Sequence, residues 1–379
     1  MTNTTPTHSK ISRRRFLALV AATGVTAAGA YAIAEAAPWL NYDQAADTGR
    51  QPFQMDPAKA AQLRELIRYA TLAANGHNTQ PWKFAITEDA IDIHPDQARR
   101  LAGVNPNDRE LWISLGCALE NLLVAARATG YAAEVTYPAA TDFIRVRLTS
   151  DTPQHSPLFD AIPVRQNTRS EYDGQIVPAG DLDQVQTVPL EPGVVLRFVT
   201  NPVEKETVQE YVYQGNLNQF ADQAFVEELI AWLRFNKREA VTTLDGLYTR
   251  CSGNPEVPRW LGQMFVSGTT PQQQAETDAK KLRSSPGSVV VASEADDKTS
   301  WVRAGQVYER MALQMAALNI KSAFLNQPIE VAELRGQFQS AMGLGAALPQ
   351  LLLRYGYADA MPRSLRRPID QVLTPSHSE

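Results

Sequence analysis

Trp112-Ile113-Ser114-Leu115-Gly116-Cys117-Ala118-Leu119-Glu120 and Trp301-Val302-Arg303-Ala304-Gly305-Gln306-Val307-Tyr308-Glu309 are two copies of one W-x-x-x-G-x-x-x-E pattern. The Trp, Gly and Glu of the second copy each lie 189 positions after their counterparts in the first. The same offset places Asn319 opposite Gly130, and both residue types suit the C-terminal end of a helix. We interpret the match as an internal duplication of an α+β unit.

The first unit is expected to span residues 54–150. Between residues 56 and 69, Leu63, Leu66 and Ile67 recur at helical spacing, with Asp56-Pro57 at the helix start. The helix that carries the first copy of the pattern is expected from Pro106 to Gly130. It is apolar on nearly every face, which predicts that it is buried. Strands are expected at residues 83–86, 90–93, 134–136 and 143–146.

The second unit is expected at residues 155–209 and 286–379, interrupted by an insertion at 210–285. The insertion is rich in helix formers and aromatic residues and ends in a polar stretch that includes Gln272-Gln273-Gln274. Because a segment of this length with its own apolar residues is seldom a linker, we expect a lid or cap. The alternative is a helical satellite that packs on the outside.

Composition excludes several classes of protein and site. The 379 residues carry a net charge of −5, so no global charge attracts nucleic acid, and an anion site must come from locally clustered Arg or Lys. Cys117 and Cys251 are too few for a disulfide framework, and metal-type Cys/His spacing is absent. The sequence contains neither H-E-x-x-H nor G-x-S-x-G. Gly343-Leu344-Gly345-Ala346-Ala347 lacks the rest of a dinucleotide fingerprint and is expected to be a helix end.

The N-terminus is typical of an export signal. Ser12-Arg13-Arg14-Arg15-Phe16-Leu17 precedes an Ala/Gly-rich apolar run to about Ala34, and Ala34-Glu35-Ala36 suits cleavage. We therefore expect residues 1–36 to form a twin-arginine signal and the protein to be periplasmic or otherwise extracytoplasmic, and to be anchored to the membrane if the signal is not cleaved. The alternative is a basic arm with a weak membrane anchor. The twin-arginine route carries folded proteins, often with a cofactor, so a cofactor is expected.

Two kinds of segment could build a binding site. Asn75-Gly76-His77-Asn78-Thr79-Gln80-Pro81-Trp82 packs amides, glycine and an indole into one loop, although an amide-rich turn before a strand would look the same. Arg165-Gln166-Asn167-Thr168-Arg169 and Arg366-Arg367 carry guanidinium pairs that can hold a phosphate dianion. Solvated surface charge is the alternative for both arginine segments.

Taken together, these segments resemble those of the FMN-dependent nitroreductases, in the Acg-type branch in which two subunits' worth of fold are fused. The loop from Asn75 to Trp82 resembles the P-S-x-x-N-x-Q-P-W loop of that family, with Asn75 where Ser is usual. The segment 165–169 resembles its R-x-S-x-R phosphate motif, with Asn167 in place of Ser. Arg366 and Arg367 match a C-terminal basic pair. Lys321-Ser322-Ala323-Phe324-Leu325-Asn326-Gln327-Pro328 resembles the segment that passes over flavin N5.

The resemblance implies a three-layer α-β-α fold, duplicated as a monomeric pseudo-dimer, with one FMN site between the halves. The first half has the loop and the second half has the arginines, so one complete site remains where a homodimer has two. The resemblance implies phosphate contacts for Arg165, Asn167, Arg366 and Arg367, and a place near the flavin pyrimidine for Arg169. It implies that ribityl and ring contacts come from the loop and that the Leu325 or Asn326 N–H contacts N5. The loop residues concerned are Asn75, Gly76, His77, Asn78 and Gln80.

Two functions fit this resemblance. One is an exported oxidoreductase that transfers two electrons to nitro compounds or quinone-like acceptors. The other is a protein that sequesters FMN and turns over little, which the scarcity of nicotinamide donors outside the cytoplasm favours. A duplicated scaffold without a cofactor is the third reading. Because a lone buried carboxylate is costly, we also expect Glu120 and Glu309 to pair with arginines across the pseudo-dimer.

Overall fold

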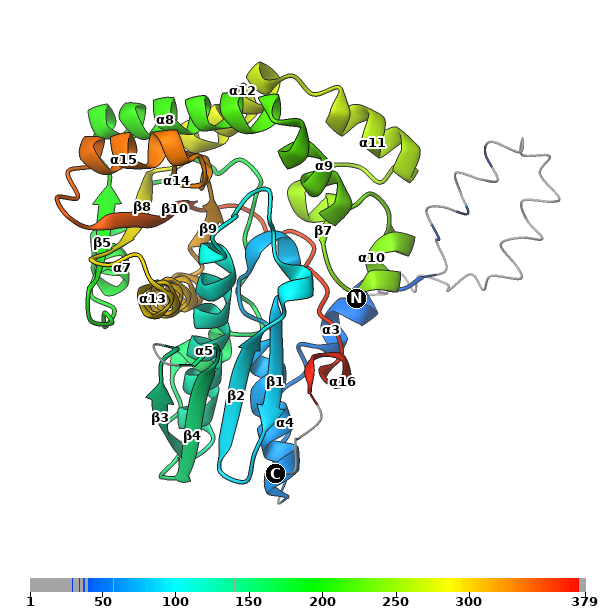
Figure 1. Cartoon of the computed structure of the whole chain (residues 1–379), viewed down its shortest axis with the longest axis vertical. Coiled ribbons are helices and arrows are strands. Elements are labelled where there is room, and N and C mark those ends of the chain that lie inside the picture. The colour runs from blue at the N-terminus through cyan, green and yellow to red at the C-terminus, as the bar shows by residue number, and fades with distance from the viewer. Residues whose placement is uncertain are drawn as a thin grey trace, which may run out of the picture.

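The protein is described from a computed structural model, which covers residues 29, 34, 37, 40–56, 58–138 and 141–374 (Figure 1). The export signal expected at residues 1–36 lies almost wholly outside these described residues and stays a prediction. Among the described residues, helices pack on two separate antiparallel four-stranded sheets, which confirms the α+β class.

Two central helices hold the halves together. α5 (Arg109–Ala128) and α13 (Lys298–Ala317) carry the two copies of the W-x-x-x-G-x-x-x-E pattern and pack against each other. Both helices are followed by a residue with positive φ, 89° at Gly130 and 59° at Asn319, as the repeat predicts. α5 is long and apolar enough to cross a membrane, but it is mostly buried inside the fold, as a core helix is.

The first sheet has the strand order β1-β2-β4-β3. α4 (Lys59–Ala70) packs on α5 beside this sheet. Phe84 in β1 forms a bridge with Leu373, so the end of the chain lies against the sheet of the first half. The expected strands are all present, with longer bounds: β1 Trp82–Ile86, β2 Ala90–Pro95, β3 Tyr131–Thr136 and β4 Ile144–Ser150.

The second sheet has the order β5-β8-β10-β9 and is covered on both faces. Every residue of β8 is buried, because Val289 and Val291 face the core around α13 while Val290 faces a second apolar cluster on the other side of the sheet. This half therefore has the three-layer α-β-α arrangement. Its strands are β5 Val194–Val199, β8 Gly287–Ser293, β9 Lys321–Phe324 and β10 Leu348–Gly356.

The segment expected as one lid divides into two parts. α8 (Pro202–Ala221) begins before residue 210 and, with α12 (Pro271–Arg283), forms the outer layer of the second sheet. Only the part between them projects beyond that layer, toward the end of the first half that carries the loop at residues 75–82 (Figure 1). It contains α9 Gln223–Trp232, β6 Leu233–Arg234, α10 Lys237–Thr243, β7 Leu247–Tyr248, η3 Thr249–Ser252 and α11 Arg259–Ser267.

The remaining elements are short and connect these layers. They are α3 Tyr42–Thr48, η1 Gly76–Asn78, η2 Gln97–Arg99, α6 Pro157–Ala161, α7 Ala179–Gln186, α14 Gln327–Glu330, α15 Ala332–Ala341 and α16 Ile369–Val372. The half fingerprint at Gly343 follows the end of α15, and Gly343 has a φ of 63°, as expected for a helix end.

The two buried carboxylates of the repeat are both paired with arginines. Glu120 accepts two hydrogen bonds from Arg310, at 2.7 and 2.8 Å, and this pair crosses between the halves as expected. Glu309 instead pairs with Arg165 of its own half, at 2.8 Å. The expected crossing is therefore wrong for Glu309, although its carboxylate also accepts the backbone N–H of Ala74 in the first half.

Candidate functional site

The loop after α4 is held in an unusual backbone conformation. His77, Asn78 and Gln80 have φ values of 45°, 53° and 53°, in the left-handed region that Asn and His tolerate better than most residues. The side chain of Asn75 closes the loop by accepting the N–H of Gln80 at 2.9 Å. The hydrogen bond from Gln80 to Asn75 thus holds the loop in one backbone conformation.

The other amides of the loop bind the projecting part of the insertion and the C-terminal segment. Asn78 Nδ2 donates to the carbonyls of Gly246 and Leu365, at 3.1 and 3.2 Å. Gln80 Nε2 donates to the Leu244 carbonyl at 2.9 Å, and Gln80 Oε1 accepts the backbone N–H of Arg367. The loop therefore joins three parts of the chain that are far apart in sequence.

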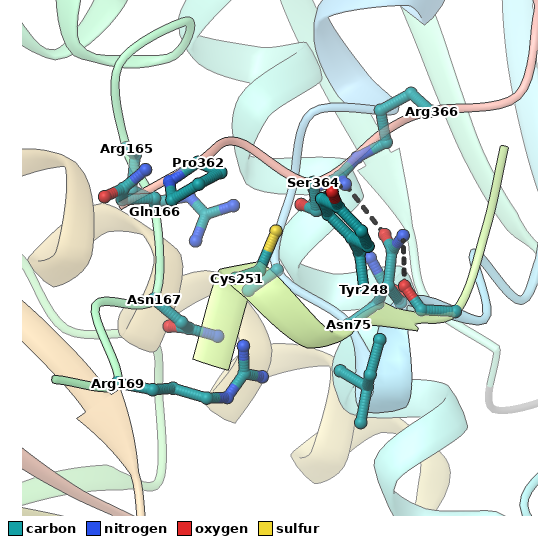
Figure 2. Close-up of a pocket in the computed structure, with 14 residues that line it drawn as sticks. Asn75, Arg165, Gln166, Asn167, Arg169, Tyr248, Cys251, Pro362, Ser364 and Arg366 are labelled. Carbon is teal, nitrogen blue, oxygen red and sulfur yellow. Dashed lines mark hydrogen bonds between the residues drawn. The ribbon is translucent and has the colours of Figure 1, made fainter. Parts of the chain in front are cut away.

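A polar cavity lies beside this loop, between the two halves (Figure 2). The space between its lining residues, which includes space open to solvent, amounts to about 520 Å³. Figure 2 shows the side chains of Asn167 and Arg169 pointing into this space from one side. The lining residues are Ala74, Asn75, Asn78, Arg165, Gln166, Asn167, Arg169, Gly246, Leu247, Tyr248, Cys251, Pro362, Ser364 and Arg366.

Two of the arginines that line the cavity are held by contacts within the protein. Arg366 donates to the carbonyls of Thr71, Leu72 and Ala73 at the C-terminal end of α4, and to Asn78 Oδ1 at 2.7 Å. Arg165 pairs with Glu309 and donates to the Leu72 carbonyl at 2.8 Å. Both guanidinium groups donate to the Leu72 carbonyl, one of the carbonyls just beyond the end of α4 that lack a partner within the helix. Their first role is to hold the wall of the cavity.

Arg169 differs from these two arginines. It makes no hydrogen bond or ion pair with any of the described residues, and burial lowers the pKa of its guanidinium. Asn167 beside it accepts a hydrogen bond from the Tyr308 hydroxyl at 3.3 Å, which leaves its amide N–H groups free of protein partners in the described part of the chain. Arg169 and Asn167 therefore offer donors to a ligand.

His77 lies close enough to Arg169 to be affected by its charge. Burial, with a smaller contribution from the Arg169 guanidinium, lowers the pKa of His77 to about 4. The imidazole is thus neutral at pH 7. Its Nδ1 is buried and has no hydrogen-bond partner among the described residues.

Positive charge is concentrated around the cavity. Burial, followed by the charges of Arg363 and Arg165, lowers the pKa of Arg50 to about 10. Burial, followed by the charges of Arg50 and Arg165, lowers the pKa of Arg366 well below its ordinary value. Glu309 neutralises only one of these guanidinium groups directly. A bound anion would relieve the remaining repulsion, so this arrangement of charges favours an anionic ligand.

The structure separates the residues that the sequence singled out into two groups. Leu325 and Asn326 do not line the cavity: the Leu325 N–H donates to the Leu352 carbonyl at 2.9 Å, and Asn326 Oδ1 accepts the Leu352 N–H. The Leu325 N–H is thus engaged within the protein, and the N5 contact that the resemblance implied for the Leu325 or Asn326 N–H stays a prediction. The cavity brings together Asn75, Asn78, Arg165, Asn167, Arg169 and Arg366, and its lining leaves out Gly76, His77, Gln80, Leu325, Asn326 and Arg367.

Arg367 points away from the cavity. Its guanidinium donates to the Gln80 carbonyl at 2.6 Å and lies 3.7 Å from Asp96. The expected phosphate contact of Arg367 is therefore corrected to a contact with the base of the loop. For Arg366, the expected phosphate contact competes with the hydrogen bonds that already occupy its guanidinium.

One wall of the cavity comes from the insertion and carries no sequence signal. Gly246, Leu247, Tyr248 and Cys251 line it, and Gly246 has a φ of 74°. The Asp245 carboxylate holds this wall in place with two ion pairs. One, at 2.6 Å, is with Arg234 of the insertion, and the other, at 2.9 Å, is with Arg99 of the first half. No motif marks these residues, and only the fold brings them to the site.

The chain is similar to known proteins over most of its length. It is 26% identical over 342 residues to "Putative NAD(P)H nitroreductase Rv3131" of Mycobacterium tuberculosis, which covers 87% of this chain and 96% of that protein. It is 23% identical over 327 residues to "Putative NAD(P)H nitroreductase acg" of the same organism, which covers 82% of this chain and 94% of that protein. No family model matches.

Solved structures give more distant matches. The FMN-dependent nitroreductase NfnB from Mycobacterium smegmatis in complex with NADPH has a TM-score of 0.39 and 14% identity, covering 58% of this chain and 98% of that one. A nitroreductase with bound FMN from Bacteroides fragilis has a TM-score of 0.32 and 17% identity, covering 54% and 90%. Along nearly the whole length of these mycobacterial proteins, the chain is therefore similar to proteins named as putative NAD(P)H nitroreductases, one of which is acg.

Proposed function

We propose that this protein binds one FMN in the cavity between its two halves and acts as an exported two-electron oxidoreductase on nitro compounds or quinone-like acceptors. The observation that carries the proposal is Arg169. Its guanidinium lines a cavity with other guanidinium groups and has no partner among the described residues. A phosphate is the ligand group that such a site binds best.

The residues of the cavity fit FMN in separate roles. Arg169, for which the resemblance implied a place near the pyrimidine, would instead hold the phosphate together with the amide of Asn167, because their donors are free of protein partners in the described chain. Asn75 and Asn78 would face the rest of the ligand from the loop of the first half. Arg165 and Arg366 keep the wall in place and add positive charge. When bound, FMN would supply the two-electron chemistry, while the protein sets binding, orientation and electrostatics.

A second function, storage of FMN with little turnover, is favoured by the insertion. Tyr248 and Cys251 form part of the cavity lining, and Asp245 holds this wall to Arg99. A wall fastened in this way restricts the access of a second substrate to the flavin. Both functions rest on the same FMN site and differ only in turnover.

Anaerobic reduction of the purified holoprotein with NADPH separates the two functions. Loss of the flavin absorbance near 450 nm within seconds, followed by reoxidation with a nitroarene or a quinone, supports the reductase. An unchanged spectrum after an hour supports storage or a different donor such as a quinol. Dithionite is the control, because it shows that the bound flavin can be reduced.

Export is a separate part of the proposal. Arg13 and Arg14 stand where a twin-arginine signal requires them. The variant Arg13→Lys/Arg14→Lys should stay in the cytoplasm, while the wild-type chain should reach the extracytoplasmic fraction through the twin-arginine machinery. Equal distribution of the two chains would refute this route.

A further inference from the structure

The helix α11 presents its largest apolar side chains to solvent. Trp260, Met264 and Phe265 are 57%, 56% and 58% exposed, whereas the residue of α11 that is buried is Gly262. An ordinary surface helix buries its apolar stripe against the core and exposes its polar face. α11 instead leaves these three apolar side chains in solvent, so its outer face lacks a partner within the described chain.

This orientation of α11 is fixed by specific contacts. A Cβ added to Gly262 would lie 2.1 Å from the ring of Phe235, so only glycine permits this close approach. Arg259 at the start of the helix pairs with Glu239 at 3.0 Å, and the Val257 N–H donates to the Phe235 carbonyl at 3.0 Å. The exposed face is therefore held outward by packing on the inner face. In Figure 1, α11 lies at an outer corner of the molecule.

The size of the exposed face favours one kind of partner. The three side chains together expose roughly 350 Å², whereas a stable dimer buries about 800 Å² on each partner. A second copy of the chain would thus gain too little contact here. A lipid surface needs no matching shape, and Trp, Met and Phe on one side of a short helix suit the boundary between headgroups and acyl chains.

The path of the chain brings the same region toward a membrane. α3 packs on α10, and the rings of Tyr42 and Tyr248 lie 4.4 Å apart, so the chain enters the fold on the insertion. The apolar run of the sequence ends at about Ala34, eight residues before Tyr42. Eight residues of extended chain span at most about 28 Å. If that run lies in a bilayer, the insertion is kept close to the bilayer surface.

We propose that α11 rests on a lipid bilayer, with Trp260, Met264 and Phe265 in the interfacial layer. The contact depends on apolar surface, so it does not require the chain to be cationic. The proposal is independent of the flavin site, and its failure would leave the proposed function untouched.

The test uses the full chain with an environment-sensitive fluorophore at Phe265→Cys and, as the matched control, at Ile176→Cys. Ile176 is 84% exposed on another part of the molecule. Cys117 and Cys251 are buried, and treating the unsubstituted chain with the fluorophore shows whether either of them is labelled. Vesicles of phosphatidylcholine and phosphatidylglycerol that contain a spin-labelled lipid should quench the probe at position 265 about twofold or more and leave position 176 nearly unchanged.

Two further arms make the result decisive. Trp260→Ser/Met264→Ser in the Phe265→Cys background should remove the quenching, because the remaining apolar surface is too small. Absence of quenching at position 265 with the chain bound to vesicles, or equal quenching at both positions, would overturn the proposal. A probe signal at position 265 that changes with protein concentration in the absence of vesicles would also overturn it, since a second copy would then cover α11.

Discussion

Gly116 and Gly305 lie at the crossing of the two central helices, each against the backbone of the other helix. A Cβ on Gly116 would lie 2.1 Å from the Val302 carbonyl oxygen, and a Cβ on Gly305 would lie 2.1 Å from the Ile113 carbonyl oxygen. Val302 and Ile113 each precede the glycine of their own helix by three residues, so the contact is symmetric. The close packing of the two helices therefore requires glycine at this position of the repeat.

Alanine at either glycine should force the two halves apart. We expect Gly116→Ala and Gly305→Ala each to lower the free energy of unfolding by about 3 kcal/mol, since the added methyl group meets backbone that cannot move alone. Denaturant unfolding of the apoprotein measures the change. Gly336→Ala in α15 is the control, because nothing lies within 4 Å of the added Cβ, and it should be neutral or stabilise by up to about 1 kcal/mol. Equal effects at positions 116 and 336 would contradict the packing account.

Arg169 and Arg366 should respond differently to the same substitution. Arg169→Gln removes a guanidinium with no partner among the described residues, so we expect FMN affinity to fall about 10-fold to 100-fold with little change in apoprotein stability. Arg366→Gln leaves the carbonyls of Thr71, Leu72 and Ala73 with fewer donors. It should therefore lower the stability of the apoprotein more than its affinity for FMN. Flavin titration and thermal unfolding of both variants measure the two effects. The reverse pattern would show that Arg366 is the phosphate ligand.

Asp245 should control how fast the flavin leaves. Asp245→Asn weakens its contacts with Arg234, which is nearly buried, and with Arg99, which is partly exposed, and should cost about 2 kcal/mol of stability while speeding FMN release. Stopped-flow fluorescence of released FMN measures the rate. Asp89→Asn, which affects an exposed ion pair with Arg147 at 3.2 Å, is the control and should change the stability and the rate of FMN release little. An unchanged release rate in Asp245→Asn would mean that the insertion wall does not limit exchange.

A buried carboxyl group should make stability depend on pH. Burial, followed by the neighbouring Glu110, raises the pKa of Glu330 well above its ordinary value, although Gln219 donates to it at 2.5 Å and Arg109 opposes the shift. A raised pKa in the folded state contributes stability below the unfolded pKa of about 4.3, and this contribution is lost as pH rises through the folded value.

The variant Glu330→Gln mimics the protonated carboxyl group. Its free energy of unfolding should therefore fall less than that of the wild-type chain as the pH rises from 5 to 8. Glu333→Gln, at an exposed position of α15, is the control and should follow the wild-type chain. Parallel curves for Glu330→Gln and the wild-type chain would contradict the raised pKa.

The sequence predicted the duplication, the strands of the first half and the meeting of the loop with the arginines. These features depend on local periodicity and on one repeated pattern, which a single chain displays directly. The insertion wall at Gly246 and Cys251 could not be predicted, because its place depends on the Asp245 contacts with Arg99 and Arg234. The different roles of Arg169 and Arg366 were also hidden, since both are arginines in short basic motifs and only burial and partners distinguish them.

The central claim is that one anionic flavin binds between the two halves. The ratio of FMN to protein in the purified holoprotein, after reconstitution with excess FMN and removal of the unbound flavin, tests it most directly. We predict about one FMN per chain for the wild-type protein and a clear loss in Arg169→Gln. A colourless wild-type chain, or two FMN per chain, would contradict the single site.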